Sequence, residues 1–349
     1  MSQEEIDQKV ESTKTEFQNK VLLVSFDDQS KTAKKLKKEV DVLDQVVLES
    51  VPDDRTFNFI TLKPAIDKAK EEGHNLLIAI DPENNRVSLV VRKEKDGLMM
   101  VLNSHQVAAI LFYRWSNSGK YNDLLLLKSV LISDLMDNLA HKGGINTIDE
   151  VIDQGDLSTA FQRVKKENVD NPIVGFNIDQ QVMHSDLEFE DIVAELTQIE
   201  AEQGALEKTM FDYLLEIYFY NGFYKEKTVS LDIATKAQAK QLATFMDSIR
   251  KNPKSLEATF PLSTITDYTK GKKINVLTDK VYPFASSTTN MLKIEGTNYV
   301  FITFAPTAEK MTYYISIRES VNSKQRFEVV NKMLDQEIMK VVQMLNRGI

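Results

Sequence analysis

The chain of 349 residues contains no cysteine. This absence excludes disulfide bonds, thiolate catalysis and zinc sites built from cysteine, and it fits a reducing compartment. No stretch approaches the roughly 18 consecutive apolar residues expected of a membrane-spanning helix. The segment from Met1 to Lys20 is too polar for a secretory signal. We therefore expect a cytoplasmic protein with no membrane insertion.

Histidines and familiar catalytic motifs are also scarce. The four histidines lie far apart without metal-ligand spacing, and each is interpreted as a surface or capping residue: His74, His105, His141 and His184. The chain has no P-loop, no Gly-x-Gly-x-x-Gly motif and no Gly-x-Ser-x-Gly motif. Its formal net charge of −9 argues against nonspecific nucleic-acid binding, because such binding depends on clustered cations.

The composition, with 42% hydrophobic and 27% charged residues, is typical of a globular protein of two or three domains. One stretch stands out. Leu76 to Ile80 is an apolar run that predicts a buried strand, Pro82 ends it, and Val87 to Val91 predicts a second strand. The loop between them offers oxygen ligands and one cation to a divalent metal or a phosphate, although such a loop is also typical of a plain turn. Its residues are Asp81, Glu83, Asn84, Asn85 and Arg86.

The segments before this loop alternate between strand and helix. Strands are predicted at Val21 to Phe26 and Val46 to Ser50, and Pro64 and Gly73 frame a helix. A further helix carries the lysines between residues 31 and 38, which we interpret as a solvated face. This alternation predicts a parallel sheet.

A second α/β unit is expected downstream. Leu124 to Ile132 predicts a strand, Ser133 or Asp134 a cap for the next helix, and Ile173 to Phe176 another strand. Ser185 with Glu188 predicts a capping box. Beyond the predicted linker at Lys251 to Leu256, short strands and a final helix predict an antiparallel α+β layer with its helices on one face.

The loop pattern Asp81, Glu83, Asn85, Arg86 resembles the metal loop of the phosphohexomutases, the phosphoglucomutase and phosphomannomutase family, in which three aspartates alternate before an arginine. The stretch from Lys208 to Lys227 closely resembles the family's helix after its sugar-binding loop. The resemblance implies domains two to four of that family. These are two α/β domains with mainly parallel sheets, then an α+β domain like the TATA-box-binding protein. The expected ranges are a lead-in at 1–18 and domains at 19–95, 96–252 and 253–349.

Three functional patches depart from the family pattern. Glu83 and Asn85 replace aspartates that hold magnesium in the family, so we expect no cofactor, or magnesium bound only weakly. The family's sugar-reading loop is represented by Asn177, Ile178 and Asp179, and its phosphate loop by Thr303, Ala305, Thr307 and Lys310. The resemblance does not reach the first domain, which carries the family's catalytic phosphoserine.

These departures favour a non-catalytic homologue, with no catalytic residue assigned, that binds or regulates in sugar-phosphate metabolism. Its expected partner is a sugar phosphate or a protein. One alternative is an active phosphohexomutase, an isomerase that transfers phosphoryl groups intramolecularly with magnesium and is complemented by a separate first domain. Another is a protein-interaction scaffold with a vestigial cleft.

Overall fold

The computed structural model describes residues 20–26, 31–39, 43–48, 56–93, 97–152, 156–252, 261–296 and 300–347. The chain divides into two compact units. The first holds residues 1–132 and 136–217, and the second holds residues 133–135 and 218–349. The predicted lead-in at 1–18, the end of the predicted strand at Ser50 and most of the predicted linker, from Pro253 to Leu256, lie outside the described residues.

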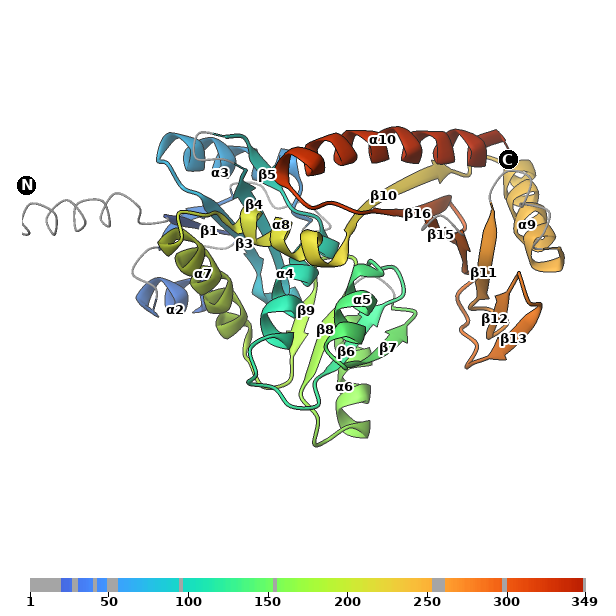
Figure 1. The fold of residues 1–349 in the computed structure, drawn as a ribbon, viewed down its shortest axis with the longest axis horizontal. Coiled ribbons are helices and arrows are strands. Elements are labelled where there is room, and N and C mark those ends of the chain that lie inside the picture. The colour runs from blue at the N-terminus through green and yellow to red at the C-terminus, as the bar shows by residue number, and fades with distance from the viewer. Residues whose placement is uncertain are drawn as a thin grey trace, which may run out of the picture. The chain divides into compact units, whose positions relative to one another are not determined.

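The first sheet of the first unit has the strand order β2-β1-β3-β4-β5, and β1, β3, β4 and β5 are labelled in Figure 1. Its strands are β1 (Val21–Ser25), β2 (Leu43–Val47), β3 (Leu76–Asp81), β4 (Arg86–Arg92) and β5 (Met99–Val101). β1 pairs in parallel with β2 and β3, as the alternation of strand and helix predicted. β4 and β5 then add antiparallel, so only the first half of this sheet is parallel.

Helix α2 (Lys31–Glu39) follows β1, and α3 (Phe59–Glu71) covers one face of the sheet. The side chain of Asn58 begins α3 by accepting hydrogen bonds from the backbone N–H groups of Ile60 and Thr61 at 2.9 and 3.0 Å. Pro64 lies inside the helix rather than in its first residues. The buried face of α3 packs on apolar strand residues of this sheet, and the packed set includes Leu22, Val24, Leu62, Ala65, Ile66, Leu77 and Ala79.

The second sheet has the order β7-β6-β8-β9, with β6 parallel to β7 and β8 and with β9 antiparallel to β8. Its strands are β6 (Leu125–Ser129), β7 (Asn146–Glu150), β8 (Ile173–Phe176) and β9 (Val182–His184). The helices of this part are α4 (Ser104–Ser116), α5 (Leu135–Lys142), α6 (Leu157–Glu167), α7 (Phe189–Ala205) and α8 (Met210–Asn221).

The two predicted helix caps in this region have different outcomes. Ser133 Oγ accepts a hydrogen bond from the backbone N–H of Leu135 at 3.2 Å, which confirms the cap of α5. The capping box predicted at Ser185 and Glu188 is wrong. Ser185 Oγ instead accepts from the N–H of Ile173 at 3.0 Å, and Glu188 is itself the N-cap of α7, with its N–H bonded to Asp191 at 2.9 Å.

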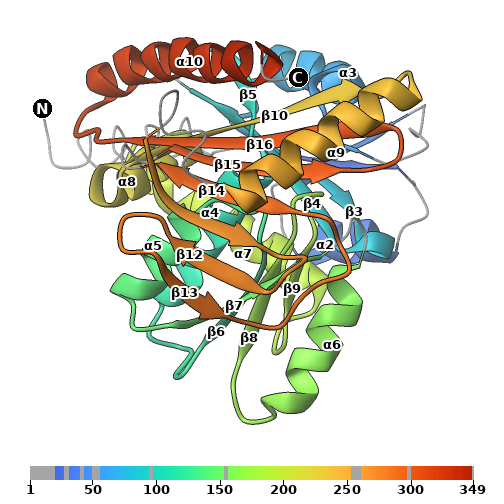
Figure 2. The same cartoon turned by 90° about the vertical axis from the view of Figure 1, so that its right-hand side faces the viewer.

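The second unit is built on a seven-stranded antiparallel sheet with the order β10-β16-β15-β14-β11-β12-β13 (Figure 2). Its strands are β10 (Phe223–Asp232), β11 (Leu262–Asp267), β12 (Lys272–Asn275), β13 (Lys280–Pro283), β14 (Leu292–Gly296), β15 (Val300–Pro306) and β16 (Lys310–Glu319). β10 pairs along its whole length with β16, so it belongs to this sheet although it falls within the predicted range 96–252. The proposed division into three domains stays a prediction.

Helices α9 (Lys236–Lys251) and α10 (Lys324–Arg347) cover the same face of this sheet. Cross-strand register places Tyr313 opposite Phe304, whose ring lies 6.0 Å from that of Phe245 on α9. Phe223 lies on the same face of the sheet, and its ring is 4.8 Å from that of Phe327 on α10. The predicted α+β arrangement is therefore confirmed.

Candidate functional site

The predicted metal loop is a tight turn between β3 and β4. A short 3-10 helix (Pro82–Asn84) follows Asp81, and Asn85 adopts a left-handed conformation with a φ of 52° before β4 begins. Asp81 is buried, and its Oδ2 accepts a hydrogen bond from the side-chain amide of Asn84 at 2.7 Å. Left-handed backbone is readily adopted by asparagine, so the sequence forms this turn without strain.

The predicted sugar loop joins β8 to β9. Asn177 is buried at its start, and its Oδ1 accepts a hydrogen bond from the backbone N–H of Ile178 at 2.8 Å. Asp179 is also buried, and Gln180 adopts a positive φ of 70°. The loop therefore turns back on itself and directs β9 antiparallel to β8.

The structure brings these two loops together although they are far apart in the sequence. Arg86 Nη2 donates to Asp179 Oδ2 at 3.0 Å, and both side chains are largely buried. The backbone joins as well: the N–H of Val87 donates to Gln180 O at 3.1 Å, and that of Val182 donates to Asn85 O at 2.9 Å. Hydrogen bonds and this ion pair therefore hold residues 81–86 and 177–181 together, and these two segments are called the joined loops.

Side-chain amides add further links between the joined loops. Gln181 Nε2 donates to Asn84 O at 3.2 Å, and Gln180 Nε2 donates to Ser88 Oγ at 3.1 Å. Of the charged side chains here, Asp81, Glu83 and Asp179 are acidic and only Arg86 is basic. Without a cation the joined loops are therefore net negative, which suits hydroxyl and amide groups better than a free phosphate.

Comparison with known proteins supports the resemblance of the chain to the phosphohexomutases. No family model matches the chain. A phosphoglucomutase from Staphylococcus haemolyticus is 24% identical over 275 residues, which cover 73% of this chain and 48% of that protein. The chain is a divergent phosphohexomutase-like protein. It spans about half the length of that curated relative.

Solved structures show the same fold in this phosphohexomutase-like chain. A phosphoglucomutase/phosphomannomutase family protein from Burkholderia thailandensis matches 95% of the chain and 63% of its own length, at 14% identity and a TM-score of 0.54. The phosphoglucomutase parafusin from Paramecium matches 82% of the chain and 50% of its own length, at 13% identity and a TM-score of 0.53. No helix in the described ranges has the length and apolar character that crossing a membrane would require.

The predicted phosphate-loop residues of this phosphohexomutase-like chain do not lie in an open loop. Thr303 and Ala305 are inside β15, where they pair with Tyr314 and Thr312 of β16. Thr307 is in the hairpin turn, and its Oγ1 accepts from the backbone N–H of Lys310 at 3.1 Å. The role assigned to these positions stays a prediction, but only Thr307 and Lys310 have the exposure that ligand contact needs.

His184 and Glu200 are buried ionisable groups outside the joined loops, and burial shifts the pKa of each. Burial lowers the pKa of His184 to about 4, and its Nδ1 accepts from the N–H of Asp186 at 3.0 Å. Burial raises the pKa of Glu200 on α7 to about 8, although Glu200 Oε2 accepts from the N–H of Met210. His184 is therefore neutral at pH 7, and Glu200 is protonated there.

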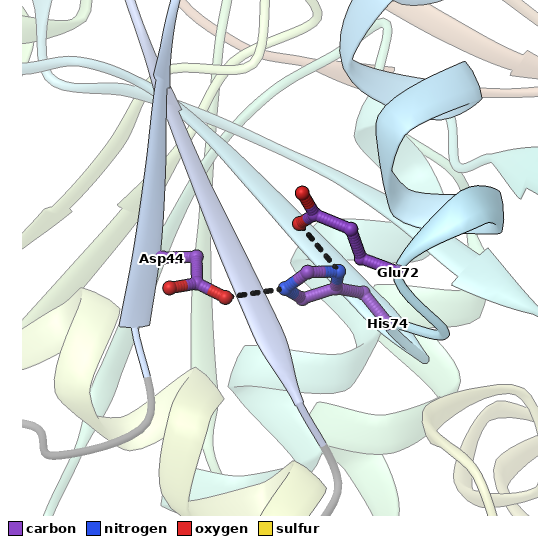
Figure 3. Close-up of side chains that lie close together, drawn as sticks. All are labelled: Asp44, Glu72 and His74. Carbon is purple, nitrogen blue, oxygen red and sulfur yellow. Dashed lines mark hydrogen bonds and ion pairs between the residues drawn. The ribbon is translucent and has the colours of Figure 1, made fainter.

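One group of side chains was not predicted from the sequence. Asp44, Glu72 and His74 lie together, close enough to hold a metal ion (Figure 3). The interpretation of the histidines as surface or capping residues is wrong for His74, His105 and His184, because all three are buried and the side chain of His74 is fully so. Asp44 lies on β2, whereas Glu72 and His74 lie at the turn between α3 and β3, so no regular spacing in the sequence identifies this group.

Proposed function

We propose that this phosphohexomutase-like chain is non-catalytic and that it binds or regulates in sugar-phosphate metabolism through the joined loops. The observation that carries the proposal is the ion pair between Arg86 and Asp179. It joins the β3–β4 turn to the β8–β9 loop, and it directs the guanidinium of Arg86 toward the buried carboxylate of Asp179. An enzyme that transfers phosphoryl groups needs such a cation directed at the phosphate.

The predicted metal positions also fit magnesium poorly. Mg²⁺ prefers near-octahedral oxygen ligands at about 2.1 Å and favours carboxylates. The Oδ2 atom of Asp81 accepts from an amide of Asn84, and Asn85 offers a neutral oxygen from a left-handed turn. A cation bound at Oδ2 would compete with that hydrogen bond, and we therefore expect weak magnesium binding and derive no reaction step through it.

Hydroxyl groups are a better match to the joined loops. Asn84, Asn85 and Gln180 contribute side-chain amides to the same loops as Glu83, which is exposed. A sugar presents hydroxyls that both donate and accept hydrogen bonds, so these groups suit the sugar part of a hexose phosphate.

Ligand-dependent thermal stability tests this proposal. The purified chain is heated with hexose 1-phosphates, hexose 6-phosphates and inorganic phosphate, each with and without Mg²⁺. A ligand at a hundred times its dissociation constant stabilises the folded state by about 2.7 kcal/mol. We expect a shift with hexose phosphates that Glu83→Gln reduces and that Glu71→Gln, at an exposed position of α3, leaves unchanged. If no hexose phosphate shifts the transition, the proposal that the joined loops bind a sugar phosphate fails.

A second candidate function is an active phosphohexomutase. The 24% identity with a phosphoglucomutase over 73% of the chain favours it. In that case the joined loops would hold magnesium. Measurable interconversion of hexose 1- and 6-phosphates would distinguish this function from the first proposal.

A further inference from the structure

Three side chains from separate elements converge at one end of the first sheet (Figure 3). Asp44 lies on the edge strand β2, Glu72 caps the end of α3, and His74 precedes β3. His74 Nε2 is 3.1 Å from Asp44 Oδ2, and His74 Nδ1 is 3.8 Å from Glu72 Oε2. One ligand atom from each residue lies within 4.8 Å of the others.

The fold holds the backbone of His74 firmly. Its N–H donates to Ala69 O at 2.8 Å, and its carbonyl oxygen accepts from the buried Arg92 through Nη2 at 2.7 Å and Nε at 3.2 Å. Gly73 has a φ of 76°, which turns the chain from α3 toward β3. Glu72 and His74 therefore sit on either side of one tight turn.

The imidazole of His74 itself points to a ligand. The side chain is 0% exposed, yet its Nδ1 has no hydrogen-bond partner among the described residues. A buried polar atom without a partner is costly, so such atoms in folded proteins usually have one. The side chains of Asp44 and Glu72 are 64% and 42% exposed, and Glu72 Oε1 also lies 3.8 Å from Lys68 Nζ.

We propose that Asp44, Glu72 and His74 bind a divalent transition-metal ion of the zinc type. An imidazole with two carboxylates suits Zn²⁺, whereas Mg²⁺ prefers oxygen ligands alone. Zinc bonds of about 2.0–2.1 Å in tetrahedral geometry separate neighbouring ligand atoms by roughly 3.3 Å. The ion would bind the unpartnered Nδ1 beside Glu72 Oε2, which lies 3.8 Å from it, whereas Asp44 lies 3.1 Å from Nε2 on the other side of the ring and must turn its exposed carboxylate to reach the ion. The exposed carboxylates leave a path for the ion and a position for water.

This site is separate from the joined loops. His74 precedes the first residue of β3, whereas Asp81 is its last residue, so the two lie at opposite ends of the same strand. β1 lies between β2 and β3 in the sheet. A metal ion held by Asp44, Glu72 and His74 therefore ties the edge strand β2 to the turn after α3, across β1.

Zinc titration of the full chain, after removal of metals with a chelator, tests the proposal. Calorimetry should show one equivalent of Zn²⁺ bound, with a rise in the thermal transition and no competition from Mg²⁺. Loss of an outer-shell partner alone lowers metal affinity by about 10–100-fold, so Asp44→Asn and Glu72→Gln should each weaken binding at least about tenfold. Glu71→Gln and His141→Asn change an exposed carboxylate and an exposed histidine outside the site, and they should leave the affinity unchanged.

His74→Asn should abolish binding, and the two exposed carboxylate variants carry the test if that buried substitution prevents folding. The proposal fails if zinc does not bind saturably or if Asp44→Asn and Glu72→Gln both bind it as the unmodified chain does. Binding lost in Asp81→Asn but kept in Asp44→Asn would place the ion in the joined loops instead. The outcome does not depend on whether the chain binds sugar phosphates.

Discussion

Asn85 has two separate effects on the turn between β3 and β4. Its left-handed φ of 52° lets the chain enter β4 directly, and its carbonyl oxygen accepts from the N–H of Val182. Its side chain, however, is neutral where the phosphohexomutase pattern has an aspartate. The residue thus keeps the shape of the turn while removing a charge.

Restoring that charge should strengthen magnesium binding. Asp and Asn both visit left-handed backbone, so Glu83→Asp with Asn85→Asp should keep the turn and add one carboxylate. We expect tighter Mg²⁺ binding by calorimetry than in the unmodified chain. Asn85→Gly is the control, because it accommodates the same backbone without adding charge. Micromolar magnesium binding by the unmodified chain would show that Glu83 and Asn85 do not lower the affinity of the loop for magnesium.

Glu200 should make the stability of the first unit depend on pH. Its pKa is raised from 4.5 to about 8 by burial, so the unfolded chain releases this proton at lower pH than the folded chain does. Below pH 4.5 Glu200 is protonated in both the folded and the unfolded chain and does not change the free energy of unfolding. That free energy then falls as the pH rises from 4.5 to about 8. Each pKa unit corresponds to about 1.36 kcal/mol.

Glu200→Gln should remove this dependence and should gain stability relative to the unmodified chain between pH 5 and pH 8. Urea unfolding at both pH values measures the difference, and Glu71→Gln is the exposed control. An equal effect of Glu200→Gln at pH 5 and pH 8 would contradict a buried, protonated carboxyl.

Gly271 has a close contact that no other residue type tolerates. Its φ is 60°, and a Cβ there would overlap the carbonyl oxygen of Phe284, while the N–H of Phe284 donates to Gly271 O at 2.9 Å. Gly271→Ala should therefore destabilise the second unit by more than the about 1–2 kcal/mol expected from left-handed backbone alone.

Gly222→Ala is the matched control in the same unit. Gly222 also has a positive φ, 86°, but its added Cβ would meet the flexible side chain of Arg318 at 2.8 Å. Urea unfolding of both variants gives the comparison. Equal losses of stability would show that the contact with Phe284 has no energetic effect.

At the scale of elements, the ion pair of Arg86 and Asp179 connects the β3–β4 turn to the β8–β9 loop. Asp179→Asn leaves a buried arginine without its carboxylate, for which a loss of about 3–5 kcal/mol is typical. Arg86→Met with Asp179→Leu should cost less than the sum of the single changes, because no charge is left buried alone.

Urea unfolding of the single and double variants measures this coupling. Asp67→Asn is the control, since Asp67 pairs with Lys63 on the exposed face of α3 and should have little effect. Strict additivity of the Arg86 and Asp179 changes would show that the two loops are not coupled through this pair.

Some elements could be predicted from sequence because their signals are local. The apolar run of β3 ending at Pro82 and the cap of Ser133 on α5 both depend on neighbouring residues, and both were confirmed. The three-residue strand β9 and the polar strand β7 carry no such run and were not predicted. The cap predicted at Ser185 was wrong because its hydroxyl accepts a hydrogen bond from β8 rather than from the first turn of α7.

The contacts within the candidate sites could not be predicted from the sequence, because they form between segments that are distant along the chain. The loop at Asp81 was identified from its residues, but its contact with the loop at Asp179 depends on pairing between distant segments. Likewise, Asp44 meets His74 only because β1 sets the register of both β2 and β3. Sequence patterns do not contain that register.

For the whole molecule, the central claim is that a phosphohexomutase-like fold is retained without phosphohexomutase turnover. The ion pair of Arg86 with Asp179, the poor fit of the loop to magnesium and the placement of Thr303 within a strand all support it. Each lost electrostatic contact in a catalytic site typically costs about a hundredfold or more in rate.

The most direct measurement is interconversion of glucose 1-phosphate and glucose 6-phosphate, and of the mannose pair, by the purified chain. The assay includes Mg²⁺ and a bisphosphorylated hexose, so that a missing phosphoryl donor is not mistaken for an inactive fold. The account predicts a rate equal to that of buffer alone, and the same rate for Asp81→Asn. Turnover above background that Asp81→Asn abolishes would contradict the account and would show that the joined loops form an active site.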